Sequence, residues 1–254
     1  DVTIWASVLP ELVRKSGHCI INIYPKLVPL YQRSFPQAEV RPDPGSYDTA
    51  QDDFDYHLPM GSLFRYATPD RDDPARQDAY LSADTDRVDY WRHQLERLGP
   101  GPYIGISWKG VVTNPSRSPN YTEVKDWSGL IRSPATFISL QCGDAALERR
   151  EFESQHGVAV HRFEELDLFD DLDDTAALAA ALDAVISVST AVSALAAGVG
   201  TPTWMIAWRQ SPWHNFLLKS RGPNVSYFER DTDEPWDRVF NDLGARLQAL
   251  TEAR

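Results

Sequence analysis

The feature that most constrains the fold is a regular alternation of strand-like and helix-like segments in the second half of the chain. Short apolar runs typical of buried strands cover residues 103–108, 137–141, 158–163, 184–188, 203–207 and 225–228. Segments with helical spacing lie between and after them, at residues 127–132, 144–155, 174–182, 190–199 and 236–250. Strands that alternate with helices in this way are typical of βαβ units. The sequence therefore predicts an α/β fold with a parallel sheet, whose ligands bind at the carboxyl ends of the strands.

Two Gly-Pro pairs at residues 99–102 form the clearest internal boundary. Before them the same alternation is less regular: helices are expected at residues 2–15, 27–34 and 84–98, and strands at residues 18–23, 38–41 and 54–58. Gly and Pro end helices and mark connections between structural units. We therefore expect two lobes, an N-terminal one over residues 1–98 and a C-terminal one over residues 99–254.

Charge and composition exclude several classes of protein. The 25 Lys and Arg residues face 37 Asp and Glu residues, a net charge of −12, which argues against binding of nucleic acid. A small phosphorylated ligand stays possible, because one helix N-terminus and one lysine can hold it. No apolar run approaches the roughly 20 residues that cross a bilayer. Cys19 and Cys142 match no metal-ligand spacing and indicate a reducing compartment, so we expect a cytoplasmic protein.

The most informative segment covers residues 183–204, where a buried strand runs into Ser189 and Thr190 and then into a helix of small residues. The first N–H groups of a helix have no intrahelical partner and suit a phosphate, and both hydroxyl groups could donate to the same anion. The alternative is that Ser189 and Thr190 only cap a helix of an ordinary αβ unit. The pattern by itself does not decide between a phosphate site and a cap.

Two other strand ends carry polar residues. Lys109 and Gly110 follow the strand at 103–108, and Gln141 ends the strand at 137–141. A lysine there could reach a pyrophosphate and a glutamine could read a base or sugar edge, although each alone is more often an ordinary loop residue. Because carboxyl ends of parallel strands meet at one edge, the three strand ends together favour a ligand site.

Other motifs do not carry a site. The acidic run at residues 170–174 lacks the glycine and the spaced glutamate of a calcium loop, and an acidic N-terminal cap of the following helix explains it better. No metal site is expected. Dinucleotide, P-loop, nucleophile-elbow and zinc-protease motifs are absent from the sequence, which disfavours hydride chemistry in particular.

Residues 104–110 (IGISWKG), residues 137–144 (FISLQCGD) and the segment 183–204 together resemble the glycosyltransferase-like domain of bacterial tetratricopeptide-repeat proteins. That domain is similar to protein O-GlcNAc transferases and, more distantly, to lipopolysaccharide heptosyltransferases. Residues 1–12 and 55–63 also resemble family segments, so the resemblance extends over nearly the whole chain. It implies a GT-B fold, in which two Rossmann-like lobes with parallel sheets face a cleft.

The resemblance implies a metal-independent, inverting glycosyltransferase that moves a sugar from a nucleotide donor to a protein hydroxyl or a saccharide. The nucleotide-sugar is a co-substrate, and no further cofactor is implied. Lys109 matches the basic residue that touches the diphosphate of the donor. Ser189, Thr190 and the amide of Ala191 match the turn that cradles this diphosphate.

The remaining expected site residues also follow from the resemblance. Ser107, Gln141 and Ser193 complete the donor-binding set, with Gln141 facing the nucleoside. Asp1 matches an acidic residue in the first loop of heptosyltransferases and is a candidate base, and His57 is a second candidate. Because the chain starts at Asp1 inside an expected helix, we expect an upstream segment, such as a repeat domain, in the whole protein.

Two positions depart from the family pattern. Heptosyltransferases keep Asp and His in the turn and helix where this chain has Ser189 and Ser193, and O-GlcNAc transferases keep Asp at the position of Ser193. The loss of these groups removes strong hydrogen bonds to a donor. The alternative to a transferase is therefore a catalytically inactive binding or scaffold module with the same fold.

Overall fold

The computed structural model describes residues 2–43, 45, 53–66, 79–112, 115, 117–209 and 224–253. Asp1, one of the two candidate bases, lies outside these ranges. Among the helices within them, none combines the length and the apolar character that crossing a membrane requires.

A six-stranded parallel sheet forms the larger part of the molecule and confirms the expected α/β fold. Its strand order is β5-β4-β3-β6-β7-β8. The strands are β3 (Tyr103–Ser107), β4 (Thr136–Ser139), β5 (Val160–His161), β6 (Ala184–Val188), β7 (Thr203–Trp208) and β8 (Val225–Arg230). The chain thus builds the sheet outward from β3 in one direction and then returns to β6 on the other side. This is the Rossmann strand order, which has its topological switch point between β3 and β6.

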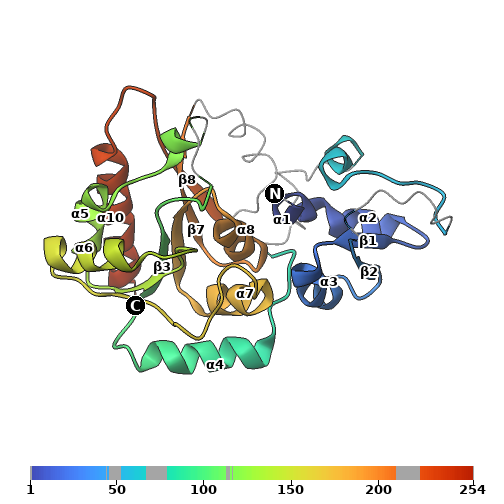
Figure 1. The fold of residues 1–254 in the computed structure, drawn as a ribbon, viewed down its shortest axis with the longest axis horizontal. Coiled ribbons are helices and arrows are strands. Elements are labelled where there is room, and N and C mark those ends of the chain that lie inside the picture. The colour runs from blue at the N-terminus through green and yellow to red at the C-terminus, as the bar shows by residue number, and fades with distance from the viewer. Residues whose placement is uncertain are drawn as a thin grey trace.

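Helices cover both faces of this sheet (Figure 1). One face carries α5 (Ser128–Ile131), α6 (Ala146–His156) and α10 (Asp237–Glu252), and its core includes the fully buried rings of Trp127, Phe152 and Phe240. The short helices η4 (Ser118–Asn120) and η5 (Val124–Trp127) lead into α5. The other face carries α4 (Thr85–Glu96), α7 (Leu172–Ala181) and α8 (Ala191–Gly198).

Small residues allow close packing between the sheet and the second helix layer. A Cβ atom added at Gly105 of β3 would lie 2.5 Å from the side chain of Leu140 and 2.7 Å from that of Leu182. Helix α8 is built almost entirely of Ala, Gly, Val and Ser, and its residues 192–198 are buried. The helix therefore lies directly on the sheet, with its N-terminus at the carboxyl end of β6.

The N-terminal unit is smaller. Its elements are α1 (Val2–Trp5), η1 (Ala6–Val8), α2 (Leu9–Lys15), β1 (Ile20–Ile23), η2 (Pro25–Leu27), α3 (Val28–Ser34), β2 (Glu39–Pro42) and η3 (Met60–Arg65). Strands β1 and β2 form a separate parallel pair. The predicted helices and the first two predicted strands are therefore confirmed, with shifted ends, while a complete second Rossmann-like lobe stays a prediction.

The predicted strand at residues 54–58 is wrong. In the structure this segment has no strand pairing and leads into η3, and Phe54, Tyr56 and Leu58 are all exposed. Their alternation with polar residues imitates the two-residue period of a half-buried strand. No partner strand lies beside the segment within the described ranges, so the apolar positions gain no burial.

The N-terminal unit packs against α7 and α8 (Figure 1). Leu172, Ala176 and Leu195 of these two helices share a buried cluster with Leu30 and Tyr31 of α3. The acidic run at residues 170–174 reinforces this contact: Arg33 of α3 forms an ion pair with Asp173, and Lys26 Nζ lies 3.7 Å from Asp170.

The same acidic run caps α7 and holds α4. Asp171 accepts a hydrogen bond from the amide of Asp174 at 3.0 Å, which confirms the expected acidic cap. Asp174 in turn accepts from Arg87 Nη2 at 2.7 Å and from Trp91 Nε1 at 2.8 Å, both on α4. Helix α4, which precedes the predicted lobe boundary near residue 99, therefore packs on the large sheet unit, and the boundary itself stays a prediction.

Candidate functional site

The strand ends that the sequence singled out meet at the topological switch point of the large sheet. In the register of β3 and β6, Ser107 lies beside Ser187. Lys109 follows the end of β3 by two residues, and Ser189 and Thr190 follow the end of β6. In open parallel sheets the crevice outside such a point is where ligands bind. The structure therefore brings Ser107, Lys109 and the turn at Ser189 to one edge.

Thr190 and Ser193 form a capping box at the start of α8. The Thr190 side chain accepts from the amide of Ser193, and the Thr190 amide donates to Ser193 Oγ at 3.1 Å. The same hydroxyl donates to the Thr190 carbonyl oxygen at 2.8 Å, and the side chain of Ser193 is completely buried. The hydroxyl of Ser193 therefore stabilises the turn, and its contact with a donor stays a prediction.

The next two amides of α8 remain available. Capping boxes satisfy the N-cap and N3 amides, while the N1 and N2 amides point out of the helix. Here these are the amides of Ala191 and Val192, and neither meets an acceptor in the part of the chain that the structure describes. Ser189 and Ala191 are exposed, and Val192 is buried, so the turn meets solvent on the side of Ala191. Two such donors and the helix dipole together favour an anion.

Ser187 is a site residue that the sequence analysis missed. Its side chain is fully buried, its hydroxyl donates to the Val188 carbonyl oxygen at 2.7 Å, and it lies 3.3 Å from Thr190 Oγ1. A serine inside a buried apolar strand was the available signal, because a buried hydroxyl needs partners. Through its contact with Thr190 Oγ1, Ser187 fixes the position of the N-cap residue of α8.

Gln141 is occupied by internal hydrogen bonds. Its Oε1 accepts from the amides of Trp108 at 3.0 Å and Lys109 at 3.1 Å, and lies 3.3 Å from Ser107 Oγ. Its Nε2 donates to the Lys109 carbonyl oxygen at 2.8 Å, and the residue is 1% exposed. Gln141 and Ser107 thus hold the strand ends of β3 and β4 together. Contact of Gln141 with a nucleoside, and of Ser107 with a donor, stays a prediction.

Lys109 lies between the switch point and α6. Its ammonium group forms an ion pair with Glu148 in the first turn of α6, and the side chains are 37% and 24% exposed. The pair borders a groove of about 220 Å³ that Trp108, Glu151 and the η5 segment also line. No sequence pattern indicated Glu148, because 39 residues separate it from Lys109.

The remaining predicted catalytic residue is not brought to this edge. His57 is exposed in the irregular segment before η3, and its ring lies 5.8 Å from that of Phe54. A role for His57 as a base, like the role of Asp1, stays a prediction.

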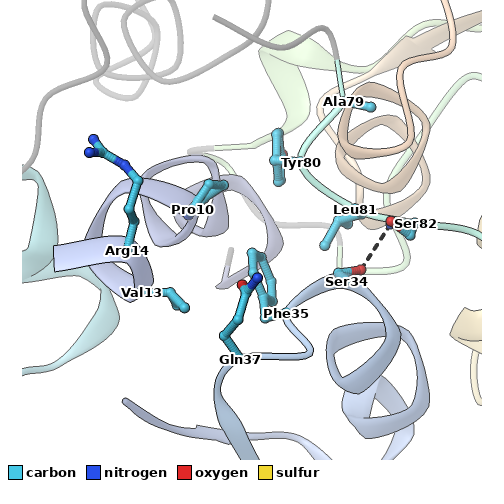
Figure 2. A pocket seen from close by; sticks show the side chains of 10 residues that line it. All are labelled: Pro10, Val13, Arg14, Ser34, Phe35, Gln37, Ala79, Tyr80, Leu81 and Ser82. Carbon is cyan, nitrogen blue, oxygen red and sulfur yellow. Dashed lines mark hydrogen bonds between the residues drawn. The ribbon is translucent and has the colours of Figure 1, made fainter. Parts of the chain in front are cut away.

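A second cavity lies elsewhere. It has a volume of about 660 Å³ and is lined by α2, the end of α3, the residues after it and the segment 79–82, including Arg14, Gln37 and Tyr80 (Figure 2). The amides of Tyr80 and Leu81 donate to the carbonyl oxygen of Gly198, at the C-terminal end of α8. The eight residues of α8 span about 12 Å, so this cavity lies near the end of the helix opposite Thr190. It is therefore separate from the switch-point edge.

Among the residues that the structure describes, metal ligands gather at neither place. Over the described ranges, no three His, Cys, Asp or Glu side chains are grouped so that they could hold a metal ion. The carboxylates of residues 170–174 instead serve as helix cap and as partners of Lys26, Arg33 and Arg87.

Comparison with solved structures places this arrangement among glycosyltransferase folds. The chain superposes on ADP-heptose LPS heptosyltransferase II of E. coli with a TM-score of 0.63 at 14% identity, over 99% of this chain and 96% of that one. A glycosyl transferase family 9 protein of Veillonella parvula gives a TM-score of 0.64 at 12% identity, over 99% and 93%. At these identities the likeness concerns the fold, and it confirms the glycosyltransferase-like fold expected from the sequence.

Among curated proteins, protein FlbA of Caulobacter vibrioides is 30% identical over an alignment 272 positions long. The alignment covers 98% of this chain and 44% of FlbA, so the chain spans less than half the length of this relative. No protein-family model matches the chain. The expected similarity to O-GlcNAc transferases and to repeat proteins stays a prediction.

Proposed function

We propose that this chain is a metal-independent, inverting glycosyltransferase domain that uses a nucleotide-sugar donor. The observation that carries the proposal is the pair of amides of Ala191 and Val192 at the switch point of a Rossmann-type sheet, which meet no acceptor among the described residues. The fold shared with two solved glycosyltransferases supports it. One of these is described as using ADP-heptose, and the donor proposed here is more generally a sugar linked to a nucleoside diphosphate.

In the proposed reaction an acceptor hydroxyl attacks the anomeric carbon of the sugar, and the bond from this carbon to the diphosphate oxygen breaks. The acceptor proton passes to a base, for which Asp1 and His57 are the candidates. Negative charge develops on the departing diphosphate. The amides at the start of α8, the hydroxyl of Ser189 and the ammonium of Lys109 would stabilise this charge electrostatically.

The acceptor is proposed to be a protein hydroxyl, with a saccharide as the other possibility, and an additional segment of the whole protein would select it. FlbA is more than twice as long as its aligned part, which leaves room in that relative for such a segment.

The decisive variant is Ala191→Pro. Thr190 has an extended backbone, with φ of −134° and ψ of 174°, which is the conformation favoured before proline. Proline is well tolerated at the first helical position, where its missing N–H group has no helical partner to lose. The variant therefore deletes one anion-binding donor and leaves the helix in place. Ala191→Ser is the matched control, because it keeps the amide.

The measurement is calorimetric titration with ADP, UDP, GDP and CMP and with their sugar conjugates, combined with thermal unfolding. We expect at least one nucleotide to bind the wild-type chain and the Ala191→Ser variant, and to bind Ala191→Pro at least about tenfold more weakly, as the loss of a charge-assisted hydrogen bond predicts. Unchanged affinity of Ala191→Pro, or no binding of any nucleotide to the wild-type chain, would refute the proposal.

The second candidate is a catalytically inactive module that keeps the same fold. The observation in its favour is that Gln141, Ser193 and Lys109 all have internal partners, which leaves few side chains at the edge for a ligand. Slow hydrolysis of a bound nucleotide-sugar, followed by release of free sugar, distinguishes the transferase from this module.

A further inference from the structure

The backbone of Lys109 is fixed by hydrogen bonds, whereas its ammonium group stands on a flexible four-carbon stem. The Gln141 side chain bonds both the amide and the carbonyl oxygen of Lys109, so the position of its Cα atom is set by the sheet. The direction of the side chain then decides which anion the ammonium group meets. In the structure it meets Glu148 on α6.

The surroundings of this pair are acidic. The groove beside it is lined by Glu123, Glu148 and Glu151, against Lys109 and Lys125. Lys125 is paired with Glu123 at 2.6 Å, and Glu151 accepts from Gln155 Nε2 at 2.8 Å. Three carboxylates against two ammonium groups make the groove itself unfavourable for a diphosphate. An anion at the α8 turn therefore gains Lys109 only if this side chain leaves Glu148.

We propose that Glu148 is an internal counterion of Lys109, which competes with the phosphate groups of a nucleotide for the same ammonium group. This inference rests on the proposed function and assigns a positioning role to Glu148. In the free protein Glu148 neutralises Lys109. In the complex the ammonium group turns from α6 toward the start of α8, and the carboxylate of Glu148 is left to solvent at 24% exposure or more.

The competition predicts a gain of affinity when Glu148 loses its charge. Because exposed ion pairs contribute little, Glu148→Gln should bind a nucleoside diphosphate about two- to fivefold more tightly than the wild-type chain. Glu148→Asp keeps the charge and should bind as the wild-type chain does. The matched control is Glu151→Gln, one turn further along α6, which removes the same charge and should change the affinity by less than about 1.5-fold.

Lys109→Ala supplies the other half of a double-mutant cycle. Lys109→Ala should weaken nucleotide binding. Adding Glu148→Gln to it should give no gain in affinity, because Glu148 then has no ammonium group at position 109 to compete for. Equal affinity of Glu148→Gln and the wild-type chain, weaker binding of Glu148→Gln, or the same gain in the Lys109→Ala background would each overturn the proposal.

A measurement without nucleotide separates this inference from the proposed function. Acylation of Lys109 by an amine-reactive ester, followed by mass spectrometry of the digested chain, reports how far Glu148 shields the ammonium group. We expect faster labelling of Lys109 in Glu148→Gln than in the wild-type chain and in Glu151→Gln, with Lys125 unchanged. Unchanged labelling of Lys109 would overturn the proposal that Glu148 is its counterion, even if nucleotides bind. Changed labelling together with no nucleotide binding to any variant would overturn the proposed function, and with it the competition.

Discussion

The side chain of Gln141 holds the backbone of Lys109 from both sides: Oε1 accepts from its amide at 3.1 Å, and Nε2 donates to its carbonyl oxygen at 2.8 Å. One amide group thereby ties the end of β4 to the end of β3 across the edge of the sheet. Gln141, which the sequence analysis expects to contact a ligand, thus positions the backbone of another expected site residue, Lys109.

Replacement of Gln141 should cost substantial stability. In Gln141→Leu the buried amide of Trp108 and the partly buried amide of Lys109 lose their acceptor. We expect the free energy of unfolding to fall by about 3 kcal/mol, as unsatisfied buried groups predict. Urea titration followed by tryptophan fluorescence measures this. Gln155→Leu, which removes an exposed glutamine with one bond to Glu151, is the control, and an equal loss in both variants would contradict the assignment.

The hydroxyl of Ser193 should matter for stability more than that of Ser189. Ser193→Ala removes a buried group that both accepts from and donates to Thr190, and should lower the free energy of unfolding by about 1 kcal/mol, as loss of a cap does. Ser189→Ala, four residues earlier and exposed, should leave this free energy nearly unchanged. A smaller loss for Ser193→Ala than for Ser189→Ala would rule out the capping role.

Asp174 should be the most important carboxylate of the acidic run. Asp174→Ala leaves Trp91 Nε1, on a fully buried ring, and the partly exposed Arg87 without their acceptor. We expect a loss of about 2 kcal/mol in the free energy of unfolding. The comparison is Asp89→Ala, which breaks an exposed pair with Arg92 on the same helix; its thermal midpoint should stay within about 1–2 °C of the wild-type value.

One carboxylate should make the protein less stable as pH rises. Burial raises the pKa of Asp126 above its ordinary value of 3.8, although the Glu123 amide that donates to it acts in the opposite direction. Between 3.8 and the raised pKa the folded state binds more protons than the unfolded state, so the free energy of unfolding falls with pH.

Asp126→Asn keeps an oxygen for the Glu123 amide and removes this titration. Its stability relative to the wild-type chain should therefore rise as the pH increases from about 4 to 7, as urea titrations at several pH values will show. Parallel stability curves for the two proteins would contradict the raised pKa.

The large sheet was predictable because its strands are continuous apolar runs separated by helix signals, and burial on both faces leaves little ambiguity. The Ser189-Thr190 turn was predictable for a similar reason, since Ser and Thr mark helix starts. The strand predicted at residues 54–58 was wrong, because alternation of apolar side chains indicates a strand only where a partner strand exists.

The side-chain partners within the site were not predictable. Gln141 and Lys109 are separated by 32 residues, and Glu148 and Lys109 by 39 residues. Their contacts depend on the strand order, which places β4 beside β3 and α6 over the same edge. Local patterns identify polar residues at strand ends, but only the fold decides whether such a residue faces a ligand or the backbone of a neighbour.

A buried cluster joins the two halves of the chain: Leu172, Ala176 and Leu195 share it with Leu30 and Tyr31. This cluster limits the exchange of one half between related proteins. These residues come from before and after the Gly-Pro boundary, so a cut there would expose apolar surface on both fragments. Exchange of either half between related proteins would succeed only if the incoming half brought a matching surface. The two halves are therefore expected to be inherited, and to change, as a pair.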